Sequence, residues 1–323
     1  MGYMKTDAQL VTTPKTTDSL ASLSEQTARY VEAGLQGAPN TARAYASDLR
    51  HFTHWCKANQ VEPVPATVDT LAGYVTYLAD AGKKVATIHR HLSAIGKAHV
   101  LQGYNCPTDN KQFQVLLDGI RRVHGVRQKQ APAFTLAQLK RLVRAIDTQT
   151  VTGLRDRVIL LLGFTGAFRR SELSALNVQD LRFTEECLIV SMAKSKTNQL
   201  GDYEEKAIFY SPEANVCPIR SIQAWLRVLD RDAGPVFVGM RMGQRLTQVR
   251  LSDKSINAVV QRYLGPNYSA HSLRASFVTV AKLAGADDAE VMNQTKHKTS
   301  TMIRRYTRLD NIREHNAASK LGL

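Results

Sequence analysis

The spacing of apolar residues in the first half of the chain constrains the fold most, because it predicts helices and no strands. Tyr45, Leu49, Phe52 and Cys56 recur at steps of three and four residues, which places them on one face of a helix. The same pattern repeats in three further segments, residues 68–79, 85–101 and 112–123. We therefore predict an all-helical domain over residues 18–126.

A polar, basic segment with one proline, residues 127–134, predicts an interdomain linker. The following region, residues 135–309, mixes two periodicities. Two short apolar runs, 188–192 and 207–210, favour strands, and the polar stretch 195–202 between them predicts a hairpin loop. Helices are predicted around residues 135–146, 155–164, 218–229, 252–263, 271–283 and 287–294. We expect a mainly α, two-domain protein: a helical N-terminal domain and an α+β second domain, mostly helical with a small antiparallel sheet.

The chain is strongly basic. Its 43 Lys and Arg residues exceed its 28 Asp and Glu residues by 15, and the excess occurs in both predicted domains. Residues 83–129 alone hold nine cations and two acidic residues. Such a surplus favours a polyanionic partner, whereas the alternative is a basic protein whose cations simply face water.

On the predicted helices, the cations lie opposite the apolar faces. A basic helix face suits contact with phosphates, and a helix can enter the major groove of DNA. The candidate DNA-binding residues are Arg43, Ser47, Arg50, Lys83, Lys84, Arg90, Lys97, Arg121, Arg122 and Lys254.

Signs of several other protein classes are missing from the sequence. The four cysteines lie far apart without a CxxC pair, so we expect neither a metal site nor a disulfide framework. The longest apolar run, residues 158–164, is far too short to span a membrane. Residues 1–17 are polar and predict a flexible arm rather than a secretion signal. These patterns predict a cytoplasmic protein without membrane association.

The segment from His271 to Tyr306 concentrates groups able to act on a phosphodiester. Arg274 and His297 lie between them, and Arg169 upstream supplies a second guanidinium. A tyrosine phenol, with a pKa near 10, is a poor nucleophile unless arginines hold an anionic target and neighbouring groups move protons. Taken singly, each residue could be a core histidine or a surface side chain. Their joint arrangement favours attack of a phenol on a phosphodiester.

These residues resemble the motifs of the tyrosine recombinase (phage integrase) family. Residues 165–173, Thr-Gly-Ala-Phe-Arg-Arg-Ser-Glu-Leu, match the family's Thr-Gly-Leu-Arg-x-Ser-Glu-Leu pattern. The register makes Arg169, three residues before Glu172, the catalytic arginine. Lys196 in the predicted hairpin loop matches the family's lysine, with Lys194 as the alternative.

The resemblance continues downstream. His271 and Arg274 match the family's His-x-x-Arg box, His297 its His-or-Trp position, and Tyr306 its nucleophile. The family usually has glycine just before the last histidine, where this chain has Lys296. The likeness covers nearly the whole chain, and the layout resembles the two-domain Cre-like recombinases.

The resemblance implies a reaction without metal, ATP or any other cofactor. Arg169 and Arg274 are expected to hold the non-bridging oxygens of the scissile phosphate. Tyr306 is expected to attack, which gives a 3′-phosphotyrosine and a free 5′-hydroxyl. His271 is the candidate base and Lys196 the candidate acid that protonates the leaving oxygen.

The same resemblance assigns supporting roles and partners. His297 is expected to hydrogen-bond the phosphate, and Glu172 to support the site from behind. The implied partner is double-stranded DNA with inverted-repeat target sites, bound by a monomer or dimer at one site and by a homotetramer in the synaptic complex, in a prokaryotic or phage setting. Residues 310–323 predict a short, weakly amphipathic helix. The family favours docking of this helix in trans, and the alternative is that it folds back on its own domain.

Two other functions fit parts of the pattern. A type IB topoisomerase-like enzyme uses the same phosphotyrosine chemistry to relax DNA as a monomer. A DNA-binding protein that has lost catalysis would share the basic faces. The separate helical half favours recombination over the first, and the complete set of six residues argues against the second.

Overall fold

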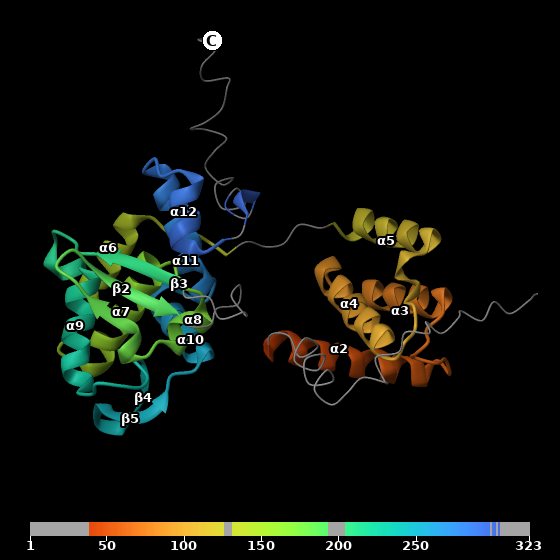
Figure 1. Cartoon of the computed structure of the whole chain (residues 1–323), viewed down its shortest axis with the longest axis horizontal. Coiled ribbons are helices and arrows are strands. Elements are labelled where there is room, and N and C mark those ends of the chain that lie inside the picture. Colours follow the sequence, from red (N-terminus) through yellow and green to blue (C-terminus); the bar gives the residue numbers. More distant parts are fainter. Residues whose placement is uncertain (1–38, 126–130, 193–203, 298, 302, 304–323) are drawn as a thin grey trace, which may run out of the picture. The chain divides into compact units, whose positions relative to one another are not determined.

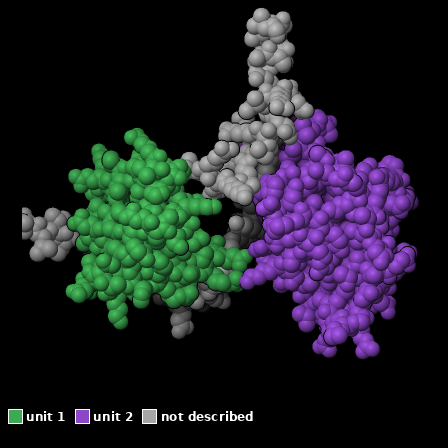
Figure 2. All heavy atoms as spheres, turned by 180° about the vertical axis from the view of Figure 1, so that it is seen from behind, with its two compact units in different colours: residues 1–128 green, residues 129–323 purple. Residues whose placement is uncertain are grey.

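The computed structural model describes residues 39–125, 131–192, 204–297, 299–301 and 303. The chain divides into two compact units, residues 1–128 and 129–323, coloured separately in Figure 2. Lys196, Tyr306, the predicted N-terminal arm and the predicted tail helix lie outside the described residues. None of the helices in the described part of the chain has the length and apolarity needed to cross a membrane.

Unit 1 is helical throughout its described part (Figure 1). Its helices are α2 (Pro39–Ala58), α3 (Val68–Asp80), α4 (Val85–Leu101) and α5 (Lys111–His124), with a 3-10 turn, η2 (Pro107–Asp109), before α5. Side-chain caps define two helix starts, because Thr67 accepts from the backbone of Thr70 and Asn110 from that of Phe113. Phe52, Tyr74 and Phe113 are buried in the core that joins these helices.

Unit 2 combines helices with two small antiparallel sheets (Figure 1). The helices are α6 (Leu136–Ala145), α7 (Val151–Thr165), α8 (Arg170–Ala175), α9 (Pro218–Leu229), α10 (Asp253–Leu264), α11 (Ala270–Leu283) and α12 (Asp288–Thr295). The first sheet has the order β1 (Leu181–Phe183), β2 (Cys187–Met192), β3 (Glu204–Phe209), and the second pairs β4 (Val238–Arg241) with β5 (Arg245–Arg250). In the first sheet Met192 pairs with Glu204, at the end of the β2–β3 pair where the chain enters and leaves residues 193–203.

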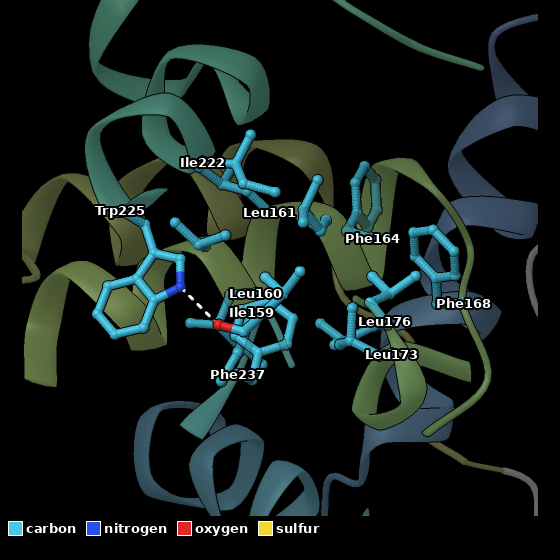
Figure 3. Packing of buried hydrophobic residues seen from close by; sticks show 14 of the residues in the cluster. Ile159, Leu160, Leu161, Phe164, Phe168, Leu173, Leu176, Ile222, Trp225 and Phe237 are labelled. Atoms are coloured by element: carbon cyan, nitrogen blue, oxygen red, sulfur yellow. Dashed lines mark hydrogen bonds between the residues drawn. The ribbon is translucent and has the colours of Figure 1, made fainter. Parts of the chain in front are cut away.

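Helix α7 runs through the middle of unit 2, because its sequence is apolar on nearly every side. Figure 3 shows Ile159, Leu160, Leu161 and Phe164 of α7 packed among side chains from other elements. Trp225 of α9 is fully buried there, and its indole N–H donates to the carbonyl oxygen of Val236 at 2.8 Å (Figure 3). This rigid core supports the turn that follows α7.

The predicted fold class is confirmed: the protein is mainly helical with small antiparallel sheets in two domains. The linker prediction reaches too far, since Phe134 packs in the core of unit 2 and its backbone N–H donates to Ser276 Oγ at 2.8 Å. Sequence periodicity missed helix α8 and strands β1, β4 and β5.

Candidate active site

Arg169 lies directly after a tight turn. Helix α7 ends at Thr165, Gly166 caps it, and Ala167 then adopts a φ of 45°. Phe168 is buried, and Arg169 is the N-cap residue of α8 with its side chain 17% exposed. The chain thus reverses within a few residues and presents Arg169 at the edge of the unit's core.

Glu172 holds this turn from the inside. Its Oε2 accepts from the backbone N–H of Arg169 at 2.9 Å, and its Oε1 accepts from the Arg169 guanidinium. Burial alone raises the pKa of Glu172, but the charges of Lys206 and Arg169 outweigh it and bring the pKa below its usual value. Glu172 is therefore a buried, ionised carboxylate that anchors Arg169.

The His-x-x-Arg box lies at the start of helix α11. A Cβ placed on Gly163 of α7 would stand 2.5 Å from Cδ1 of Leu273, so this glycine permits the close approach of the two helices. Arg274 is only 1% exposed, and its Nη1 donates to the carbonyl oxygen of Ala167 at 2.8 Å. The second candidate arginine is thereby tied to the same turn that presents Arg169.

His297 follows α12 and is also buried. Its Nδ1 lies 2.9 Å from Thr295 Oγ1, which lies 2.6 Å from the carbonyl oxygen of Val291. The hydroxyl donates its one proton to Val291, so Nδ1 of a neutral His297 carries the ring proton and donates to the hydroxyl oxygen. The carbonyl oxygen of Thr295 accepts from Arg274, which links His297 to the arginine.

Positive charge and burial lower the pKa of both histidines. For His297, burial and then the charges of Arg274 and Arg169 lower the pKa to about 3. His271 is exposed, but neighbouring protein atoms shield its ring from part of the water. This desolvation, and then the charges of Arg274 and Arg169, lower its pKa. Both imidazoles are therefore neutral at neutral pH, which leaves them able to accept a proton.

Lys206 of β3 is a member of this site that sequence reasoning missed. It is 1% exposed, and its Nζ lies 2.8 Å from the carbonyl oxygen of Gly166 and 3.6 Å from Glu172 Oε2. Burial, offset in part by Glu172 and reinforced by Arg274 and Arg169, lowers the pKa of Lys206 to about 7. In the sequence, Lys206 stands one residue before the apolar run of a predicted strand. A lysine at such a position is more often exposed than buried, so it gave no reason to expect a site residue.

The structure thus gathers Arg169, Glu172, His271, Arg274 and His297 in unit 2. Lys196 and Tyr306 belong to segments outside the described residues, 193–203 and 304–323. The last described residue, Ile303, is buried beside Val278 of α11 and Val291 of α12. The described part of the site joins two guanidiniums and two neutral imidazoles, which suits binding of a phosphate diester and transfer of protons around it. No group of three or more His, Cys, Asp or Glu side chains that could hold a metal ion occurs among the residues described.

The candidate DNA-binding residues fall on helix surfaces and adjoining turns. Arg43, Ser47 and Arg50 are exposed on α2, and Lys83 and Lys84 are exposed just before α4. Arg122 and Lys254 are exposed on α5 and α10, whereas Lys97 and Arg121 are partly buried on α4 and α5. Arg121 pairs with Asp118 at 2.6 Å, and its Nε donates to His89 Nε2 at 3.2 Å.

Arg90 of α4 differs from the other candidates, because a buried carboxylate orients it. Its Nε and Nη2 donate to the two oxygens of Asp48 at 2.7 and 2.9 Å. Asp48 is 3% exposed on α2 and also lies 3.2 Å from His91 Nε2. The chain of polar contacts continues from His91 through the Tyr74 hydroxyl to His51, with 2.8 Å at each step. Arg90 therefore leaves the helix in a defined direction.

Comparisons with known proteins identify the family to which the chain is similar. A model of the phage integrase family matches residues 133–313, and a model of the phage integrase N-terminal SAM-like domain matches residues 28–100. An integrase/recombinase xerD homolog from Selenomonas ruminantium is 36% identical over 293 residues, which is 88% of this chain and 86% of that protein. Tyrosine recombinase XerC from Thermodesulfovibrio yellowstonii is 29% identical over 84% of this chain and 86% of its own length.

Solved structures show the same fold at low sequence identity. A lambda integrase dimer bound to a COC′ core site has a TM-score of 0.57 at 16% identity, covering 90% of this chain and 95% of that one. The Tn1549 transposon integrase bound to transposon right end DNA has a TM-score of 0.56 at 15% identity, covering 88% and 99%.

Proposed function

The chain belongs to the phage integrase family and is a tyrosine recombinase, and we propose that it cuts and rejoins duplex DNA through a 3′-phosphotyrosine bond to Tyr306. The observation that carries the proposal is the joint attachment of Arg169 and Arg274 to one turn after α7. Two guanidiniums held this way suit the two non-bridging oxygens of one phosphate.

The proposed reaction needs no cofactor, because the covalent intermediate conserves the energy of the phosphodiester bond. Tyr306 attacks the phosphorus, and the 5′-oxygen leaves with a proton from Lys196. His271, kept neutral by its surroundings, accepts the phenolic proton. His297 donates to a phosphate oxygen once the Thr295 hydroxyl turns from Val291 and donates to Nδ1, which leaves the ring proton on Nε2.

Trapping of the covalent intermediate tests the proposal. Full-length protein selects its site from a randomised duplex library, and a nicked duplex carrying that site then captures the protein–DNA adduct. Tyr306→Phe should give no adduct while it binds the duplex with nearly unchanged affinity. Tyr268→Phe, which removes the hydroxyl of a partly buried tyrosine whose ring centre lies 6.2 Å from that of Phe134, serves as the matched control and should form the adduct normally. An adduct with the Tyr306 variant would contradict the assignment.

The same assay separates the alternatives. A topoisomerase-like enzyme would relax supercoiled plasmid that lacks the selected site, whereas a recombinase acts on plasmids that carry two copies of it. A DNA-binding protein without catalysis would select a site and yet form no adduct.

We further propose that the active form is a homotetramer on two inverted-repeat sites, joined by residues 310–323 of each copy. A groove of about 750 Å³ in unit 2 supports this. Its apolar lining includes Val143, Phe164 and Phe277. The exposed side chains of Leu136 and Phe209 border the groove. The predicted tail helix offers a small apolar face of matching character. Docking in trans fills the groove of a second copy.

A further inference from the structure

Lys206 combines deep burial with contacts to a single stretch of chain. Its Nζ donates to the carbonyl oxygens of Gly166 at 2.8 Å and Ala167 at 3.3 Å, and lies 4.6 Å from the centre of the Phe168 ring. The same ammonium is 3.6 Å from Glu172 Oε2. All four partners lie between the end of α7 and the first turn of α8, the segment that presents Arg169.

We propose that Lys206 is a positioning residue for DNA cleavage: it holds the turn and Glu172 so that Arg169 and Arg274 meet the scissile phosphate together. This role differs from that of Lys196, which acts on the leaving oxygen. The inference rests on the proposed phosphotyrosine chemistry.

The backbone of the turn shows why a positioning group is needed. Ala167 adopts the left-handed region without being glycine, which costs about 1 kcal/mol or more in the absence of compensating contacts. Lys206 and Arg274 both donate to the carbonyl oxygen of Ala167. The two cations, one on strand β3 and one on helix α11, therefore both stabilise the turn.

The charge of Lys206 also balances that of Glu172. The carboxylate lies between Lys206 and Arg169, and Arg274, His271 and His297 complete the ionisable groups around them. Without the ammonium, Glu172 would draw the Arg169 guanidinium inward as its sole charged partner. With the ammonium in place, the outer N–H groups of Arg169 stay available for a phosphate.

Three substitutions separate the two properties of the lysine. Lys206→Arg keeps both charge and donors, Lys206→Gln keeps donors alone, and Lys206→Met keeps neither. Lys282→Met is the matched control, because Lys282 also donates to a carbonyl, that of Ala286 at 2.8 Å, and pairs with Asp288 at 3.0 Å. The measurements are duplex affinity and the rate of adduct formation at saturating protein, on the nicked duplex described above.

The expected result is a loss of rate without a matching loss of affinity. Lys206→Met should form the adduct about a hundredfold more slowly, the scale of a catalytic group displaced by about 1 Å. Lys206→Gln should fall between Met and Arg, and Lys282→Met should react at the wild-type rate. Since a guanidinium keeps its proton, Lys206→Arg should also retain its rate at alkaline pH relative to wild type, which loses the Lys206 proton.

Several outcomes would overturn the inference. The first is adduct formation at the wild-type rate in both Lys206→Met and Lys206→Gln. The second is a folded Lys206→Gln that loses rate and duplex affinity equally. The third is a rate that depends on pH in the same way in wild type and Lys206→Arg. If Lys206→Met does not fold, Lys206→Gln and the pH profile decide. Failure of the wild-type protein to form any adduct would instead reject the proposed function itself.

Discussion

Lys196 is expected to protonate the leaving oxygen, and a sulfur substitution in the DNA isolates this role. Lys196→Ala should cleave ordinary duplex slowly, by roughly 10²-fold or more, the usual contribution of a general acid. Sulfur at the 5′-bridging position leaves without protonation, so the defect should largely vanish on that substrate. The rates of adduct formation on the two substrates provide the measurement.

Lys194→Ala is the control for this experiment, because Lys194 is the other lysine of the predicted loop. It should behave like wild type on both substrates. If Lys196→Ala is equally slow on both, and Lys194→Ala shows the sulfur rescue instead, the acid is Lys194.

The lowered pKa of Lys206 predicts a specific dependence of stability on pH. In the folded protein this pKa is about 7, whereas the ordinary value is 10.5. Between these pH values the unfolded chain holds a proton that the folded protein has released, so the free energy of unfolding should rise with pH across that window. In Lys206→Met this contribution is absent. Urea unfolding of both proteins from pH 7 to pH 10 measures the difference, which should grow by on the order of a few kcal/mol. Parallel stability curves would contradict the lowered pKa of Lys206 in the folded protein.

At the scale of elements, the contact between α2 and α4 predicts how DNA sequence is read. Asp48→Asn places an amide donor against the donors of Arg90 and so releases the guanidinium from its bidentate contact. We expect roughly 1–3 kcal/mol lower stability, the scale of a lost hydrogen bond to a charged group. We also expect a weaker base preference at the position that Arg90 contacts, because arginine reads guanine through two aligned N–H groups.

Selection from a randomised duplex library tests this expectation. The base position whose preference is lost in Arg90→Ala is the one that Arg90 contacts. Asp48→Asn should weaken the base preference at this position and at no other. Arg43 is exposed and donates a hydrogen bond to Asn40 Oδ1 at 3.2 Å. Arg43→Ala should weaken the base preference at a different position or at none. An unchanged preference in Asp48→Asn would show that the buried carboxylate serves stability alone.

The sequence predicted the elements whose apolar spacing is strong. Helices α4 and α9 begin and end where the spacing placed them, at Val85–Leu101 and Pro218–Leu229. Helix α8 has six residues, too few for a periodic pattern, and β5 is mostly exposed, so its alternation carries little signal.

Sequence motifs indicated the candidate site residues, whereas nothing in the sequence indicated the buried charged side chains that contact them. Arg169, Arg274 and His297 occupy positions that the family pattern indicates. Lys206 and Asp48 were missed because charged side chains are rarely buried, and only tertiary contacts show which ones are. The roles of all six candidate catalytic residues stay predictions, and Lys196 and Tyr306 also lie outside the described residues.

At the scale of the whole molecule, residues 310–323 should link activity to assembly. Deleting them should leave binding to a single site close to normal and should reduce synapsis and recombination strongly, because the groove then lacks its occupant. Gel shift of one-site and two-site duplexes, together with recombination of a two-site plasmid, provides the measurement. Recombination at the full-length rate would show that the tail has no such role.

A mixing experiment separates docking in trans from docking in cis. Phe209 borders the groove and is 65% exposed, so Phe209→Asp alters the groove with little effect on folding. Alone, this variant should fail in synapsis as the deletion does. Mixed with the deletion variant, its tail can occupy the intact groove of the other copy, and recombination should partly return. A tail that docks on its own domain gives no such recovery.

The carbonyl oxygen of Ala167 accepts hydrogen bonds from Lys206 and from Arg274. Two charged donors on one oxygen withdraw electron density from that peptide group, which moves its carbonyl carbon resonance downfield. A single ¹³C label at this carbon therefore registers both side chains at once. If a phosphate draws Arg274 outward, or if Lys206 gains a proton, the resonance moves. The assembly of the site around DNA can thus be followed spectroscopically at one atom, without any modification of the DNA.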